Sequence, residues 1–313
     1  MENTSTFTTF ILDGYFILDK QKHLYFTIFL FVYVAIVLLN ALLIAVIYTE
    51  RTLHNPMFIL VCHLSVNDIY GSSSLIPHLL FNLATQFHKI SLTNCLIQIY
   101  CLHTFNIIEL TILAVMGYDR YIAICHPLRY HSLMSPRKLQ IIVIFMWFYP
   151  LITFLCYESL TIRLTFCNEI ITKTHCINFE LIKLSCTDIT VHSIIAGLVS
   201  FCVPTIDCVG IAFSYITIFV VISRSAAGES RSKAISTCTT HLIVICITYF
   251  ASMVAFLAYR IQADISPDVR VLISLTYLLV PGICNPIIYG IRTKELRVHL
   301  IKMFQFNKVV SAS

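Results

Sequence analysis

Residues 95–130, CLIQIYCLHTFNIIELTILAVMGYDRYIAICHPLRY, contain a long apolar run that ends in a pair of opposite charges. Between Cys95 and Tyr121 the run carries one acid in its middle, Glu109, and it closes on Asp119 and Arg120. About 20 consecutive apolar residues are enough for a helix to cross the hydrocarbon core of a bilayer. The stretch therefore predicts a membrane-spanning helix, residues 95–121, with a charged end.

Six further runs of similar length and character lie on either side of this one. They cover residues 24–48, 56–80, 139–157, 190–222, 234–259 and 271–291. The runs are continuously apolar rather than alternating, which argues against a β-barrel. We therefore predict an all-α membrane protein, a seven-transmembrane helix bundle that forms a single domain over residues 1–313.

The composition and the tail agree with this prediction. Of the 313 residues, 58% are hydrophobic and 12% are charged, whereas a soluble domain is about one quarter charged. The net charge of +5 is scattered between the apolar runs, so it does not indicate nucleic-acid binding. After the last run, Leu296, Leu300, Met303 and Phe304 recur at helical spacing, which predicts a short amphipathic C-terminal helix on the membrane surface.

Lysine and arginine favour one side of the predicted bundle. The segments 49–55, 120–138, 223–233 and 291–313 hold 13 of them, against 7 in the segments on the other side. The positive-inside rule then places the N-terminus, residues 1–23, outside the cell and the tail, residues 292–313, in the cytoplasm.

Two features of the extracellular side agree with that orientation. Four of the 13 cysteines, Cys95, Cys167, Cys176 and Cys186, lie on this side, where disulfides persist. Four cysteines allow three pairings, and their spacing does not choose among them. Asn3 begins an Asn-Thr-Ser glycosylation sequon on the same side.

Four segments, in order and at matching spacing, resemble the odorant (olfactory) receptor family of rhodopsin-like G-protein-coupled receptors. They are Met116–Tyr130, with Gly117 where the family has Ala, Lys233–Leu242, Pro281–Glu295, and Pro56–Phe58 together with Leu64–Asp68. The sixth run has Tyr249 where these receptors keep a tyrosine, and it lacks the tryptophan and proline of most rhodopsin-like relatives. The resemblance covers almost the whole chain.

The resemblance implies a multi-pass plasma-membrane receptor, surrounded by lipid, for a small-molecule odorant. Its signalling partner would be a heterotrimeric G protein of the stimulatory, olfactory type. An enzyme and a cofactor are not expected, because no metal-ligand cluster, phosphate-binding loop or catalytic triad stands out in the sequence. The family pattern pairs Cys95 with Cys176 and Cys167 with Cys186.

By the same resemblance, residues of four helices line a ligand pocket in the outer half of the bundle. They are Leu102, His103, Asn106, Ile107, Val199, Ser200, Val203, Ser252, Met253, Phe256 and Leu275. This mostly apolar set suits a small, largely hydrophobic molecule. For each residue plain helix packing is the alternative, and a lone membrane histidine such as His103 is more often a hydrogen-bonded structural residue.

The resemblance also implies a second set of residues, which would act in activation and G-protein coupling. It comprises Asp119, Arg120, Tyr121, Tyr215, Tyr249, Asn285, Pro286 and Tyr289. Asp119 beside Arg120 can form an ion pair that holds the inactive state, although Arg120 also serves as a plain positive-inside anchor. Pro286 removes one backbone hydrogen bond and permits a bend, with or without a switching role. Tyr289 can swing to a water-mediated partner, and the family suggests Tyr215 for this role.

Three acids lie at membrane depth, where a carboxylate is costly and points to function. The family places Asp68 close to Glu109, and the two either share a proton or hold a sodium ion as an allosteric ligand. Asp207 faces either the ligand or a buried water.

Other classes of function remain as alternatives at this point. An ion-coupled transporter would use the three acids as a relay, yet it predicts sequence repeats that do not stand out here. An intramembrane enzyme would have Asp68 and Glu109 as its single candidate pair. A non-olfactory rhodopsin-like receptor for an amine or a lipid is a further alternative, and the missing tryptophan and proline of the sixth run argue against it. An amine receptor would also be expected to carry an acid near His103, and none is present.

Overall fold

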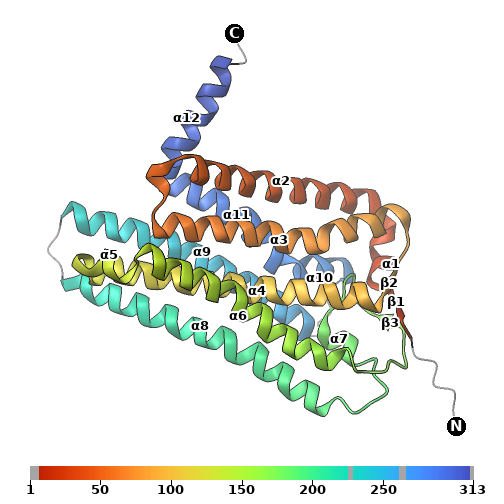
Figure 1. Ribbon diagram of the computed structural model, residues 1–313. Coiled ribbons are helices and arrows are strands. Elements are labelled where there is room, and N and C mark those ends of the chain that lie inside the picture. Colours follow the sequence, from red (N-terminus) through yellow and green to blue (C-terminus); the bar gives the residue numbers. More distant parts are fainter. Residues whose placement is uncertain (1–6, 225–227, 261–265, 311–313) are drawn as a thin grey trace.

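The computed structural model describes residues 7–224, 228–260 and 266–310. The sequon at Asn3 lies outside these residues, and so do the side chains of Ser200 and Val203. Long helices run side by side along one axis, and the two ends of the described chain lie at opposite ends of the bundle (Figure 1). We call these the N-terminal end and the C-terminal end of the bundle.

Seven long helices correspond to the seven apolar runs. They are α2 (Lys22–Thr49), α3 (Pro56–Thr85), α4 (Leu92–Cys125), α6 (Pro136–Thr161), α8 (Thr190–Arg224), α9 (Glu229–Arg260) and α11 (Thr276–Arg292). Among the described helices, five are long and apolar enough by themselves to cross a membrane. Most helices extend beyond the predicted apolar runs, because a helix continues through polar residues once it has left the hydrocarbon region. The seventh run is divided at Leu275, where α10 (Pro267–Ser274) ends and α11 begins.

The starts of α3 and α4 follow from their local sequence. Asn55 accepts a hydrogen bond from the backbone N–H of Phe58 at 3.2 Å, and Pro56 occupies the first turn of α3. Ser91 accepts one from the backbone N–H of Asn94 at 3.3 Å at the start of α4. Such side chains satisfy backbone donors that have no partner within the helix.

The helices approach closely where small or polar residues allow it. A Cβ at Gly71 of α3 would lie 2.3 Å from the ring of Phe105 on α4, so this contact requires glycine. The Asn40 amide on α2 donates at 2.9 Å to the carbonyl of Gly282 on α11. The indole of Trp147 on α6 donates at 3.2 Å to His63 on α3. These contacts fix the bundle without relying on the hydrophobic effect, which is weak between helices in lipid.

The N-terminal segment folds onto the bundle instead of extending away from it. Its strand β1 (Thr9–Leu12) is the middle strand of a small sheet, antiparallel to β2 (Lys89–Ser91) and parallel to β3 (Ile170–Ile171). The one-turn helix α1 (Gly14–Leu18) follows, and Phe10, Leu12, Tyr15 and Leu18 are fully buried. The sequence had indicated only an extracellular end here, because residues 7–18 carry no long apolar run and the partners of β1 are distant in sequence.

Short elements complete the connections. They are η1 (Asp19–Gln21), η2 (Arg51–Leu53), η3 (Pro127–Arg129), α5 (Tyr130–Leu133) and α7 (Asn178–Ile182). The predicted C-terminal helix is present as α12 (Lys294–Val310) and runs across the bundle axis (Figure 1). Its Leu296 is fully buried, with Leu300 and Met303 half-buried beside it, as expected for the apolar face of an amphipathic helix.

Candidate functional site

A cavity of about 340 Å³ lies in the N-terminal half of the bundle. Its wall is formed by α4, α6, α8, α9 and α11 and by the loop between α6 and α8. The volume falls within the range of small-molecule pockets, and the lining is mostly apolar with a few polar groups, which is the usual composition of such sites.

Seven of the eleven predicted pocket residues line this cavity. They are Leu102, His103, Asn106, Ile107, Val199, Ser252 and Phe256. Two predictions are wrong. Met253 is 58% exposed and faces away from the bundle, because it lies next to Ser252 on the helix, about a quarter turn away. Leu275 is 1% exposed and packs in the core, at the break between α10 and α11.

Several lining residues were missed by the sequence analysis. Phe154 and Tyr157 come from the part of α6 that corresponds to the charge-free run 139–157, whose faces the sequence did not distinguish. His175, Asn178 and their neighbours come from the loop. The disulfide implied between Cys95 and Cys176 predicts that this loop covers the pocket, but it does not indicate which loop residues line it.

His103 combines the two roles considered for it. Its Nδ1 lies 2.9 Å from the carbonyl oxygen of Ile99, and its ring stacks on Phe154 with centroids 4.6 Å apart. A carbonyl only accepts, so Nδ1 carries the proton and the neutral ring has an acceptor at Nε2. The histidine is thus held by the helix while it also lines the cavity.

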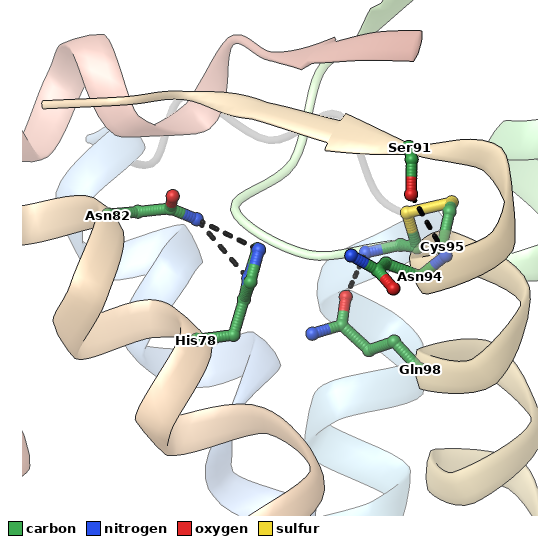
Figure 2. Close-up of a disulfide and its surroundings, with 7 residues drawn as sticks. His78, Asn82, Ser91, Asn94, Cys95 and Gln98 are labelled. Carbon is green, nitrogen blue, oxygen red and sulfur yellow. Dashed lines mark hydrogen bonds between the residues drawn. A yellow bond between two sulfur atoms is a disulfide. The ribbon is translucent and has the colours of Figure 1, made fainter. Parts of the chain in front are cut away.

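The loop over the cavity is fixed to the helices at several points. Both implied disulfides, Cys95–Cys176 and Cys167–Cys186, are present. One turn beyond Cys95, the Gln98 side chain accepts the backbone N–H of Cys176 at 2.9 Å (Figure 2). Tyr157 donates to the Asn178 Oδ1 at 2.9 Å. The loop therefore forms an anchored lid.

The lid carries a buried imidazole over the cavity. Burial lowers the pKa of His175 to about 3, and the nearby Lys173 and His103 act in the same direction. His175 is therefore neutral at physiological pH, and the lid presents no positive charge to the cavity at this point.

Below the cavity, three helices bring acids and amides together. The Asn285 amide of α11 donates to Asp68 Oδ2 at 3.2 Å and to Glu109 Oε1 at 3.0 Å. The Asn67 amide donates to Glu109 Oε2 at 3.0 Å. The carbonyl oxygens of Asn67 and Asn285 are buried without a hydrogen-bond partner among the described residues. The cluster thus holds two carboxyl groups and two unused oxygen acceptors.

Asp207 of α8 lies against α4. Its Oδ2 accepts a long hydrogen bond, 3.4 Å, from the Thr111 hydroxyl on α4. The hydroxyl groups of Tyr249 and Ser252 on α9 are buried with no hydrogen-bond partner in the described part of the chain. Of these residues Ser252 lines the cavity.

At the C-terminal end of the bundle, Asp119 binds Arg120 as predicted for the ion pair. The Arg120 Nε donates to Asp119 Oδ2 at 2.9 Å, and the Tyr130 hydroxyl donates to Asp119 Oδ1 at 2.8 Å. Burial and the Asp119 charge raise the pKa of Tyr130, which therefore stays a protonated donor. Asp119 is fully buried, so both partners are needed to compensate its charge. Tyr121, next in the chain, contacts His126 at 3.1 Å.

Tyr215 and Tyr289 each contact a different residue in this arrangement, and their water-mediated pairing stays a prediction. Tyr215 on α8 hydrogen-bonds Nδ1 of His241 on α9. The fully buried Tyr289 hydroxyl points to the sulfur of Met116 at 3.9 Å. His241 belongs to the segment 233–242 that carries the family resemblance, but its spacing did not indicate a tyrosine partner.

Comparison with known proteins gives a consistent result. The sequence profile of a family described as "Olfactory receptor" matches residues 29–307. The human protein Olfactory receptor 10H1 is 35% identical over 310 residues, which covers 98% of this chain and 96% of the relative. The human Olfactory receptor 1N1 is 33% identical over 313 residues and covers all of both chains.

Among solved structures, squid rhodopsin has the same fold. It superposes with a TM-score of 0.72 at 14% sequence identity, over 91% of this chain and 86% of the rhodopsin. The seven-transmembrane bundle predicted from the sequence is thereby confirmed.

Proposed function

The chain belongs to the olfactory receptor family, and we propose on this premise that its cavity of about 340 Å³ binds a small, mostly hydrophobic odorant. The observation that carries the proposal is the position of His103, Asn106 and Ser252, three hydrogen-bonding groups within an otherwise mostly apolar wall. Such a wall selects a molecule with an apolar body and one or two polar atoms. The family is one of receptors rather than enzymes, and we propose no catalytic activity and no resident cofactor.

The N-terminal end of the bundle is the extracellular end in this proposal, and the chain lies in the plasma membrane. The lysine and arginine distribution supports this orientation. The two disulfides of the lid support it as well, since such bonds persist outside the cytosol.

The signalling partner is a heterotrimeric G protein of the stimulatory, olfactory type, bound at the C-terminal end. The ion pair of Arg120 with the buried Asp119 stabilises the resting arrangement, because it keeps the guanidinium from other partners. Ligand binding shifts the population away from this arrangement only if the odorant binds the active state more tightly. Pro286 within α11 allows that helix to bend during the change.

A sodium ion fits the cluster of Asp68 and Glu109, and we propose it as an allosteric ligand. No three His, Cys, Asp or Glu side chains of the described residues form a metal-binding group, so a transition-metal site finds no support here. The unused oxygens of Asn67 and Asn285 and the two carboxyl groups are hard oxygen donors, which suit an alkali cation.

Cyclic AMP in cells that co-express the receptor and a stimulatory G protein tests the proposal, with a panel of small odorants. We expect a dose-dependent rise that Arg120→Ala removes and His103→Ala shifts for some odorants more than for others. The amount of receptor at the cell surface is measured for each variant. Silence of the wild-type receptor at the cell surface, with several G proteins, would contradict the proposed coupling.

A further inference from the structure

The lid closes the extracellular end of the cavity. It is joined to α4 by the Cys95–Cys176 disulfide and to α6 by the hydrogen bond from Tyr157 to Asn178. At the outer edge, the Lys183 ammonium bonds Glu180 at 3.2 Å and lies 4.0 Å above the ring of Phe179. A ligand that entered through the lid would have to break several of these contacts at once.

The N-terminal segment forms a second layer on the same loop. Strand β1 pairs with β3 of the loop, and Phe7 donates its backbone N–H to the carbonyl of Phe166 at 3.2 Å. The contact at Gly14 is so close that an added Cβ would lie 2.6 Å from the backbone of Lys173. The lid is therefore packed between the helices on one side and the N-terminal segment on the other.

The side wall between α8 and α9 is thin by comparison. Phe201 on α8 and Phe256 on α9 both line the cavity, yet the two residues are 57% and 39% exposed. Their rings meet edge to face, with centroids 6.1 Å apart and an interplanar angle of 82°. A side chain that lines a cavity and is also exposed on the outer surface forms a wall one side chain thick.

Behind this ring pair, the cavity side of α8 carries little bulk. Ala196 and Gly197 line the cavity, and a Cβ at Gly197 would meet no atom within 4 Å. Rotation of the Phe201 side chain would therefore meet space on its inner side, and an exposed aromatic side chain changes rotamer within nanoseconds.

We propose that ligands reach the cavity from the lipid bilayer, through a portal between α8 and α9 that the Phe201–Phe256 ring pair closes. The inference rests on the proposed function and deepens it, because it names the ligand class: molecules that partition into the membrane. Apolar molecules concentrate in the bilayer for the same reason that apolar side chains avoid water. Entry of the ligand into the cavity then depends on its concentration in the membrane rather than on its concentration in water.

The portal is tested without any odorant, by cysteine labelling of the receptor in phosphatidylcholine nanodiscs. The reporter is Ala196→Cys in a Cys202→Ser background, and the exposed Cys208 on the same helix is the internal standard. An alkyl maleimide that dissolves in the bilayer is compared with a permanently charged methanethiosulfonate in the water, with peptide mass spectrometry as the readout. Lys20→Cys, at an exposed position of the N-terminal segment, verifies that the charged reagent is active.

We expect the alkyl maleimide to label position 196, the charged reagent to fail there, and Phe201→Ala to accelerate alkyl labelling severalfold. Phe256→Ala, from the opposite helix, should do the same. Phe219→Ala is the matched control, because Phe219 is equally an exposed aromatic residue of α8 but does not line the cavity. Labelling of position 196 by the charged reagent at the alkyl rate, or alkyl rates unchanged in both portal variants, would overturn the proposal in favour of entry through the lid. Because labelling needs no signalling, a receptor that fails to couple still gives a clear result.

Discussion

Tyr215 of α8 and His241 of α9 are joined by a hydrogen bond in the half of the bundle that faces the C-terminal end. His241 is buried, so its Nδ1 has no water to replace the tyrosine hydroxyl. The bond links α8 and α9, and these two helices also form part of the cavity wall in the N-terminal half of the bundle. In the proposed receptor it therefore belongs to the same resting arrangement as the Asp119–Arg120 pair.

Removal of this bond is expected to raise basal signalling. A hydrogen bond contributes about 1 kcal/mol, so Tyr215→Phe should move the equilibrium about fivefold toward the active state. Basal cyclic AMP at matched surface level measures the change, and Tyr118→Phe, which alters an exposed tyrosine on α4, is the control. Unchanged or reduced basal signalling in Tyr215→Phe would place the bond in the active arrangement instead.

Two glycines of α8 allow a test of whether the odorant binds in the cavity. A Cβ at Gly197 or at Gly210 would meet no atom within 4 Å, but only Gly197 is among the cavity-lining residues. Gly197→Phe should fill the cavity and abolish the odorant response, whereas Gly210→Phe should leave it intact. Dose–response curves at equal surface level decide this, and equal responses of the two variants would place the ligand elsewhere.

The contact between Gly71 and Phe105 predicts a stability effect. A methyl group at position 71 would lie 2.3 Å from the Phe105 ring, so Gly71→Ala must push α3 and α4 apart or displace the ring. Overpacking of this kind costs about 1–3 kcal/mol. The thermal midpoint of the purified receptor should fall, and adding Phe105→Leu should restore part of it, since the smaller side chain makes room. Gly210→Ala controls for the loss of a glycine, and a midpoint equal to that of the wild type in Gly71→Ala would contradict the close contact.

The sodium site predicts stabilisation that is specific to the cation. At tenfold excess over its dissociation constant, a bound ion stabilises the folded state by about 1.4 kcal/mol. Sodium chloride should therefore raise the thermal midpoint relative to choline chloride at equal ionic strength. Asp68→Asn should abolish the difference, because it removes one of the two carboxyl groups of the cluster. The same shift with both salts would show a general effect of ionic strength.

The sequence by itself was sufficient to predict the membrane helices and the motifs that they carry. Long apolar runs specify membrane helices directly, because every backbone polar group must be satisfied within the segment. Asp119, Arg120 and Tyr130 are close in the chain, so their contact follows largely from local geometry at the end of α4. The disulfide pairing was different, since it came from the family resemblance and not from spacing.

Only the tertiary structure decided which side chains face the cavity and which residues of the loop and of the N-terminal segment cover it. Lipid and cavity are both apolar surroundings, so the sequence of a membrane helix does not distinguish the face toward the ligand from the face toward the bilayer. For this reason Ser252 and Met253, adjacent in the chain, looked equivalent, although the first lines the cavity and the second faces outward. The strand of the N-terminal segment and the partner of Tyr215 depend on residues distant in sequence, and local patterns carry no information about such pairings.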